Sequence, residues 1–196
     1  NKIIKSVKNV DYFMPTSNQL AEFYEEKLKG MKPQVKFIRN SLERYPEKTS
    51  ELEGKNIISV GRVSPEKGYL DLIDVFKIVN KKYPDWKLNI VGDGVQFQEL
   101  KNKVEKENLK DNVILHGVQN KDKIEEIMLN SSIYVMTSFT ESFGLVLIEA
   151  ESYGLPLVVF DTAQGAHEII EDGKNGFFIE NRDKEKMASK IIELIE

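Results

Sequence analysis

Residues 133–160 read IYVMTSFTESFGLVLIEAESYGLPLVVF. The runs at 133–137 and 155–160 are rich in β-branched apolar residues and predict two strands. The apolar run between them, 143–153, has the length of a helix and predicts one. Strands that are apolar on both faces and alternate with helices are typical of a parallel sheet covered on both sides.

The same alternation extends over the chain from about residue 54 to the end. Further strands are predicted at 57–61, 87–91, 113–117 and 176–179, and further helices at 68–83, 96–107, 121–129 and 183–195. The pattern predicts an α/β fold, a Rossmann-like doubly wound parallel sheet.

The amino-terminal part of the chain has a different pattern. A strand end is expected near YFMP, a helix from about Ser17, and a short strand at 35–39. One strand–helix unit cannot bury its apolar surface alone, so residues 1–34 are predicted to be the end of a preceding amino-terminal domain. The charged residues up to 54 then form a linker region, 35–54, and residues 55–196 form the main domain.

Composition excludes several classes of protein. The 196 residues carry a formal net charge of -4, which argues against a bulk nucleic-acid binder. The chain has no cysteine and two histidines, which leaves little scope for a metal site and fits a reducing cytoplasm. No apolar run reaches the roughly 20 residues that cross a bilayer, and the start is not a signal peptide. The first residue is Asn, which suggests a piece of a longer protein.

The helix after the strand at 133–137 is predicted to form an anion site. Ser142 is a suitable N-cap, so the first N–H groups lack partners within the helix. These are the amides of Phe143, Gly144, Leu145 and Val146, and the glycine admits a close approach. Such an end favours a phosphate group.

Glu149 is a carboxylate within this apolar run. It lies seven residues beyond Ser142 and therefore on the same helix face, about 10 Å along the axis. A ligand with its phosphate at the helix end could place a diol near Glu149, while Glu141 would lie beyond the phosphate on the other side. The alternative is that Glu149 forms a structural ion pair with a neighbouring Arg or Lys.

The loop GRVSPEKG, residues 61–68, follows the first strand of the main domain. Gly61 and Gly68 allow it to run close to a ligand, and Arg62 and Lys67 suit phosphate oxygens. The alternative is a solvated turn with two surface cations. The GDG turn at 92–94, His116 and His167 carry weaker signals, and a structural or incidental role is favoured for each.

Four motifs together carry a resemblance to a known family. GRVSPEKG, VGDG, ESFGLVLIEA and GAHEIIEDGKNGFFI, in this order, resemble the carboxyl-terminal half of a retaining GT-B glycosyltransferase of family 4, the glycosyl transferases group 1. The similarity covers roughly residues 35–196, and the signature Glu-x7-Glu corresponds to Glu141 and Glu149.

The resemblance implies a transfer of a hexose from a nucleotide-sugar donor, most commonly a UDP-sugar, with retention at the anomeric carbon. It implies that Arg62 and Lys67 hold the donor diphosphate, that the 143–146 amides help to cradle it, and that Glu149 binds the ribose hydroxyls. Glu141 would approach the donor sugar, and the loop at 116–118 would lie near the base. The resemblance implies no cofactor or metal. It also disfavours Glu141 as a covalent nucleophile, because the family is usually thought to use a front-face route in which the leaving phosphate helps to deprotonate the acceptor.

The chain departs from the family pattern in places. Ser142 and Gln164 stand where glycines are common, and FIRNSLE lacks the usual Pro and Gly of the hinge. The amino-terminal acceptor domain is missing, so the fragment is expected to bind donor weakly and to be inactive. The full-length protein would act on a saccharide or lipid-linked acceptor, with a peripheral contact at the inner membrane face.

Two other functions stay open from the sequence. One is a non-catalytic nucleotide-sugar-binding module on the same fold, which the presence of both carboxylates disfavours. The other is a different GT-B enzyme, such as a sugar-nucleotide epimerase or a phosphorylase, and the fold alone does not decide among these.

Overall fold

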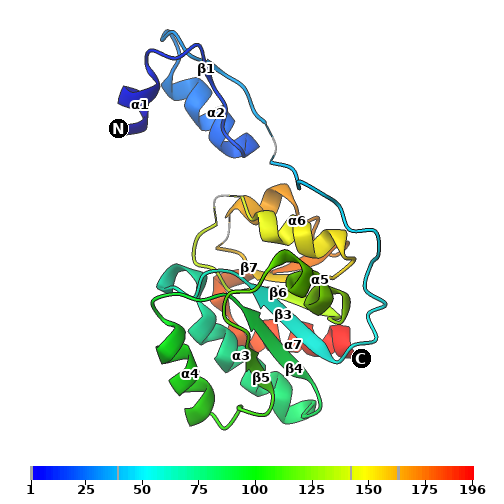
Figure 1. The fold of residues 1–196 in the computed structure, drawn as a ribbon. Helices are drawn as coiled ribbons and strands as arrows, with labels where there is room; N and C mark the ends of the chain where they lie inside the picture. The colour runs from blue at the N-terminus through cyan, green and yellow to red at the C-terminus, as the bar shows by residue number, and fades with distance from the viewer. Residues whose placement is uncertain (1, 39, 142, 163) are drawn as a thin grey trace. The chain divides into compact units, whose positions relative to one another are not determined.

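The computed structural model describes residues 2–38, 40–141, 143–162 and 164–196. The chain divides into two compact units, residues 1–43 and 44–196. Figure 1 shows the elements of both. The division falls within the stretch predicted as a linker.

The larger unit is built on a six-stranded parallel sheet with the strand order β5-β4-β3-β6-β7-β8. The strands are β3 Asn56–Val60, β4 Lys87–Val91, β5 Val113–Leu115, β6 Ile133–Met136, β7 Leu157–Phe160 and β8 Gly176–Ile179. The doubly wound parallel sheet that the sequence predicts is confirmed. The predicted strand at 113–117 is shorter, because Gly117 adopts φ +65° and forms an antiparallel bridge with Gly92.

Helices cover both faces of the sheet (Figure 1). They are α3 Tyr69–Lys82, α4 Phe97–Lys106, α5 Lys121–Leu129, α6 Leu145–Ser152 and α7 Lys184–Ile195, with 3-10 turns η1 Pro65–Lys67, η2 Gln164–Glu168 and η3 Glu180–Arg182. Alternate residues of each strand enter different cores: Ile57 packs with α3, α4 and α7, whereas Ile58 packs with α5 and α6. This alternation explains why the strands read as apolar on both faces.

The strand order places a switch point in the middle of the sheet. From β3 the chain turns first to β4 on one side and later to β6 on the other. Neighbouring connections therefore leave the carboxyl ends of β3 and β6 in opposite directions, and the crevice between them is where ligands bind in open α/β sheets.

One helix start differs from the prediction. Helix α6 begins at Leu145, and its N-cap is Gly144, which has φ 91° and ψ 52°. Phe143 therefore lies before the helix, because a residue in the left-handed region interrupts the helical path. The predicted N-cap, Ser142, lies outside the described residues.

The smaller unit consists of α1 Lys2–Val7, β1 Tyr12–Phe13, α2 Asn18–Lys27 and β2 Gln34–Val35, with β1 and β2 paired in parallel. The predicted helix after Ser17 is confirmed, and the Ser17 hydroxyl accepts a hydrogen bond from the Leu20 N–H at 3.1 Å. The strand expected at 35–39 is shorter, and α1 was not predicted.

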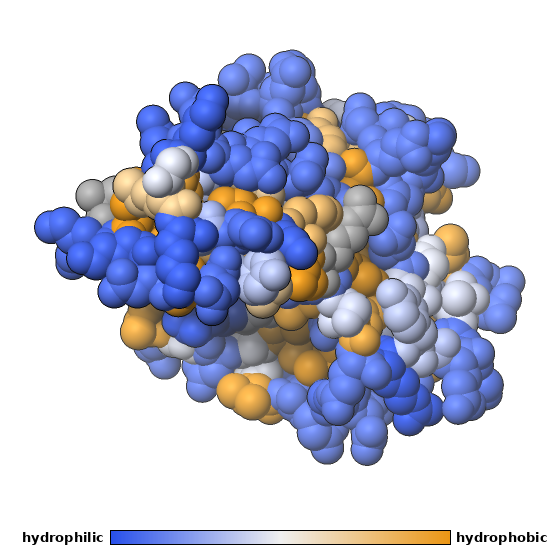
Figure 2. Space-filling model, turned by 90° about the horizontal axis from the view of Figure 1, so that it is seen from above, coloured by the Kyte–Doolittle hydropathy of each residue, from blue (hydrophilic) through white to orange (hydrophobic). Residues whose placement is uncertain are grey.

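One face of the molecule is mostly polar. In the view from above, hydrophilic residues predominate and apolar residues show between them in separate patches (Figure 2). Within the described residues, no helix combines the length and the apolar character that a membrane span needs.

Candidate active site

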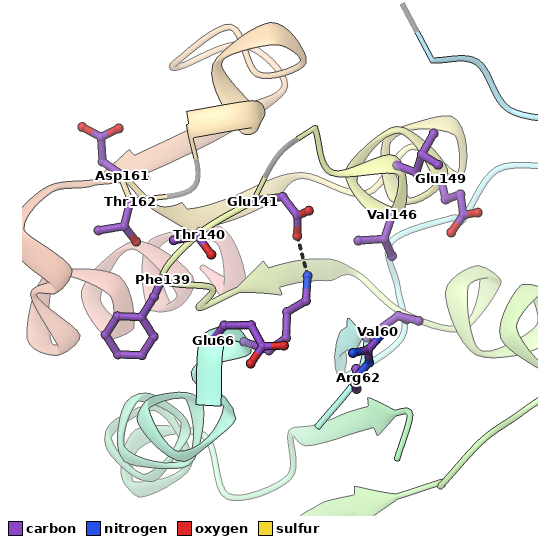
Figure 3. Close-up of a pocket in the computed structure, with 13 residues that line it drawn as sticks. Val60, Arg62, Glu66, Phe139, Thr140, Glu141, Val146, Glu149, Asp161 and Thr162 are labelled. Carbon is purple, nitrogen blue, oxygen red and sulfur yellow. Dashed lines mark hydrogen bonds and ion pairs between the residues drawn. The ribbon is translucent and has the colours of Figure 1, made fainter. Parts of the chain in front are cut away.

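A pocket of about 1120 Å³ opens at the carboxyl ends of β3, β6 and β7. It is lined by Val60, Gly61, Arg62, Glu66, Lys67, Phe139, Thr140, Glu141, Leu145, Val146, Glu149, Asp161 and Thr162. Figure 3 shows how these side chains surround it. The structure thus brings together residues of the two motifs that the sequence singles out, the 61–68 loop and the Glu-x7-Glu segment.

The two remaining residues predicted for the site are not part of this lining. Phe143 is buried, and Gly144 forms the N-cap of α6 behind the lining residues Leu145 and Val146. A Cβ at position 144 would lie 3.1 Å from Leu147 Cδ1 and 3.4 Å from Glu141 Cγ. Together with its positive φ, this close approach makes glycine the residue suited to the position.

The 61–68 loop is fixed to the end of β6. Gly68 has φ 68° and ends the turn η1. A Cβ on this residue would lie only 2.2 Å from the Thr137 carbonyl oxygen, so a side chain does not fit there. The Glu66 carboxylate accepts a hydrogen bond from the Ser64 hydroxyl at 2.6 Å, and this bond is the main reason that the pKa of Glu66 is lowered.

Lys67 and Glu141 form an ion pair inside the pocket. Lys67 Nζ lies 2.5 Å from Glu141 Oε2, with side chains that are 25 % and 14 % exposed (Figure 3). The sequence reasoning placed these residues at different parts of a ligand and missed their direct contact. The loop cation and the first carboxylate of the signature are therefore coupled before any ligand is bound.

The tip of α6 faces the same pocket. Leu145 and Val146 occupy the first turn and line the cavity, and the first N–H groups of a helix have no partner within it. The Leu147 N–H is already used, since it donates to the Gly144 carbonyl at 2.8 Å. The amides that can face an anion are consequently those at the start of α6, in the pocket that Lys67 also lines.

Glu149 lies at the opposite end of the pocket from Asp161 (Figure 3). Burial raises the pKa of its carboxyl group, and the positive charge of Lys121 opposes this only in part. A tight ion pair would lower the pKa of a carboxyl group, so the net upward shift disfavours the alternative in which Glu149 serves a structural pair.

Asp161 and Thr162, which follow β7, line the pocket and were not identified from the sequence. The Asp161 carboxylate lies 2.5 Å from His167 Nε2, and the His167 ring stacks on Phe178 with the centroids 4.1 Å apart. His167 therefore reaches the pocket only through Asp161. Both residues directly follow a predicted strand, and this position is the sequence signal that could have identified them as pocket residues.

His116 and the GDG turn have structural contacts. His116 Nε2 lies 2.9 Å from Asn89 Oδ1, and burial lowers the pKa of the imidazole. A Cβ at Gly92 would be 1.9 Å from the Gly61 carbonyl oxygen, and one at Gly94 would be 2.3 Å from that of Val63. These glycines allow the loops after β3 and β4 to approach each other.

Comparisons with known proteins agree with the geometry. The family model described as glycosyl transferases group 1 matches residues 42–196. A glycosyltransferase of Haemophilus influenzae without an assigned function is 37 % identical over 76 % of this chain and 41 % of its own length. The amylovoran biosynthesis glycosyltransferase AmsD of Erwinia amylovora is 35 % identical over 80 % of this chain and 42 % of its own length.

A solved structure shows the same fold. The crystal structure of the pneumococcal O-GlcNAc transferase GtfA, in complex with UDP and GlcNAc, matches with a TM-score of 0.87 and 26 % identity, over 100 % of this chain and 41 % of GtfA. The chain belongs to the glycosyl transferases group 1 family, and its fold is that of one part of a GT-B glycosyltransferase. It spans 41 % and 42 % of the length of the two relatives named above.

Proposed function

We propose that the chain is the donor-binding half of a retaining glycosyltransferase that moves a hexose from a UDP-sugar to a saccharide or lipid-linked acceptor. The observation that carries this proposal is the convergence of Arg62, Lys67, the α6 tip, Glu141 and Glu149 on one pocket. Residues 1–34 would then be the end of an amino-terminal acceptor domain. The full-length protein would work in the cytoplasm, with a peripheral contact at the inner membrane face.

The order of groups in the pocket supports one orientation of the donor. Glu149 would accept hydrogen bonds from the ribose hydroxyls at one end. The diphosphate would lie in the middle, between Arg62, Lys67 and the amides at the start of α6. The hexose would then point towards Glu141, Phe139 and Thr162, and the base would extend from the ribose towards the loop at 116–118.

This orientation accounts for the chemistry. Cleavage of the anomeric C–O bond leaves negative charge on the departing UDP, and fixed cations with a helix N-terminus stabilise charge that develops at that point. The leaving phosphate oxygen takes the acceptor proton on the same face, so the new bond forms with retention. The chain's own residues supply the positive charge, and the proposal includes no metal or cofactor.

Thermal shifts with a panel of nucleotide sugars test the assignment. A ligand that binds only the folded state stabilises it by about 2.7 kcal/mol at a concentration of one hundred times its Kd. UDP-sugars should raise the melting temperature of the wild type and of the control Lys101→Ala, which changes a cation on α4 outside the pocket. Arg62→Ala and Glu149→Ala should lose most of this shift, and equal stabilisation of all four proteins would contradict the site.

A transfer assay tests whether the chain is active without an acceptor half. The acceptor half is needed to close the cleft, so the 196-residue chain alone should release no hexose to an acceptor. Robust transfer by this chain would refute the view that it is the donor-binding half only.

A further inference from the structure

Arg182 lies in the turn η3 that follows β8, outside the described pocket lining, and its side chain is 16 % exposed. Its Nη1 donates to the Ser138 carbonyl and to the Thr162 hydroxyl, each at 3.1 Å. Its Nη2 donates to the Thr137 carbonyl at 2.9 Å and to the Asp71 carboxylate at 2.7 Å. One guanidinium thus binds the segment after β6, the segment after β7 and the first turn of α3.

The same guanidinium packs against an aromatic side chain that lines the pocket. Arg182 Cζ lies 3.5 Å from the centroid of the Phe139 ring and 4.5 Å from that of Phe160. Phe139 lines the pocket and is 45 % exposed, whereas Phe160 is fully buried in the core. A planar cation between two rings fixes the exposed ring against the buried one.

The 61–68 loop joins this arrangement through the segment after β6. The Thr137 hydroxyl donates to the Gly68 carbonyl at 3.0 Å, and the Phe139 N–H donates to the Glu66 carbonyl at 2.8 Å. A Cβ at Gly68 would lie 3.0 Å from Arg182 Nη2. Arg182 therefore contacts the segments after β6 and β7 directly, and the 61–68 loop is linked to it through the segment after β6.

The backbone at this point is strained. Arg182 has a φ of 52°, in the left-handed region that disfavours residues other than glycine and asparagine, and it follows Asn181, whose φ is 54°. Such strain persists only where the surrounding contacts overcome it, and it clusters at functional sites. Here the left-handed turn carries the Arg182 side chain into its contacts with the pocket segments.

We infer that Arg182 is a positioning residue that fixes the hexose end of the pocket, an inference that rests on the proposed function. It holds Phe139, Thr162 and the segment leading to Glu141 in one arrangement, and it is not one of the described residues that line the cavity. Lysine cannot replace it, because an ammonium group has neither the planar fork nor the stacking face.

Three variants test the inference. Arg182→Lys keeps the charge opposite Asp71 but loses the fork. Thr162→Val removes the hydrogen bonds of the Thr162 hydroxyl with Arg182 and with the Ser138 carbonyl, while leaving Arg182 in place. Lys184→Met is the control, since Lys184 Nζ pairs with Asp71 at 2.6 Å and with Asp74 at 2.7 Å, and it is outside the described pocket lining. The measurements are amide hydrogen exchange at Phe139 without ligand, and calorimetric titration with UDP, UDP-glucose and UDP-N-acetylglucosamine.

The expected result has two parts. Exchange at Phe139 should be about tenfold faster in Arg182→Lys than in Lys184→Met, because local opening of this segment becomes easier. The ratio of the Kd of the best-binding UDP-sugar to the Kd of UDP should rise by about fivefold in Arg182→Lys and stay unchanged in the control. A general loss of stability would weaken UDP and UDP-sugars alike.

Each other outcome decides a different point. Equal exchange at Phe139 in Arg182→Lys and Lys184→Met would overturn the inference, and so would an unchanged Kd ratio. If exchange is faster in Arg182→Lys but the wild type binds none of the three nucleotides, Arg182 remains the residue that orders these segments and the proposed function is refuted. If Arg182→Lys does not fold, exchange at Phe139 in Thr162→Val relative to Lys184→Met decides; the Kd ratio does not serve for this variant, because Thr162 itself lines the pocket.

Discussion

Glu141→Gln should strengthen the binding of UDP, although it changes a residue at the centre of the pocket. In the ligand-free protein, Lys67 Nζ is held by Glu141 Oε2 at 2.5 Å. A diphosphate that takes Lys67 as its partner must first compete with this carboxylate. Glutamine has nearly the same shape and no charge, so the substitution frees the cation without emptying the space.

The geometry sets the size of the effect. Two unit charges 2.5 Å apart attract by about 7 kcal/mol at an effective dielectric constant of about 20. Most of this is offset by the cost of removing both groups from water, and a hydrogen bond between charged groups contributes a net ~1.5–3 kcal/mol. UDP regains part of that contact, so we expect a gain of about 1–2 kcal/mol, or roughly 5- to 30-fold in Kd.

Calorimetric titration of UDP against the wild type and Glu141→Gln measures this directly. Asp161→Asn is the matched control, because it removes a carboxylate from the same pocket that is paired with His167 and not with Lys67. Its effect on UDP should be much smaller. Unchanged or weaker UDP binding by Glu141→Gln would refute the competition between Glu141 and UDP for Lys67. An equal gain in both variants would mean that the effect comes from the lower negative charge of the pocket and not from the release of Lys67.

Three further predictions concern stability. Gly68→Ala should lower the free energy of unfolding by about 3 kcal/mol or more, since it adds a clash with the Thr137 carbonyl to the ~1–2 kcal/mol cost of a left-handed residue. Gly117→Ala, at φ +65° with open space around it, should lower the free energy of unfolding only by the cost of a left-handed residue, as measured by urea unfolding. Equal losses in the two variants would disprove the close approach at Gly68. Burial raises the pKa of Glu149, so its ionisation lowers the stability as the pH rises from the unfolded-state pKa through the raised folded-state pKa. Glu149→Gln should therefore melt at a higher temperature than the wild type near neutral pH, with the difference vanishing below pH ~4. Burial lowers the pKa of His116, so the wild type should lose stability as the pH falls from about 7 to 5, and His116→Gln should lose less; parallel curves would contradict the burial of this imidazole.

The sequence predicts the elements of this fold because their signals are local. Apolar strands and amphipathic helices show their period within one segment, and helix α5 begins where Asn120 provides a side-chain cap for the Lys123 N–H. The start of α6 is missed because it depends on the backbone of Gly144, and a glycine in a sequence does not reveal its φ.

Part of the candidate site was predictable because its signals are also local. The 61–68 loop and the Glu-x7-Glu segment are each contiguous motifs. The Lys67–Glu141 pair joins residues 74 positions apart, and the Arg182–Asp71 pair joins residues 111 positions apart. Contacts of this kind are set by the strand order of the sheet, which a single sequence does not specify.

The orientation of the donor along α6 is the central claim, and a double-mutant cycle on the ribose end tests it most directly. UDP and 2′,3′-dideoxy-UDP are titrated against the wild type and Glu149→Ala. We predict that removing the two hydroxyl groups weakens binding to the wild type by about 1.5–3 kcal/mol and has little effect on Glu149→Ala, because their acceptor is already gone. An equal loss in both proteins would contradict the account, since the ribose would then lie away from Glu149.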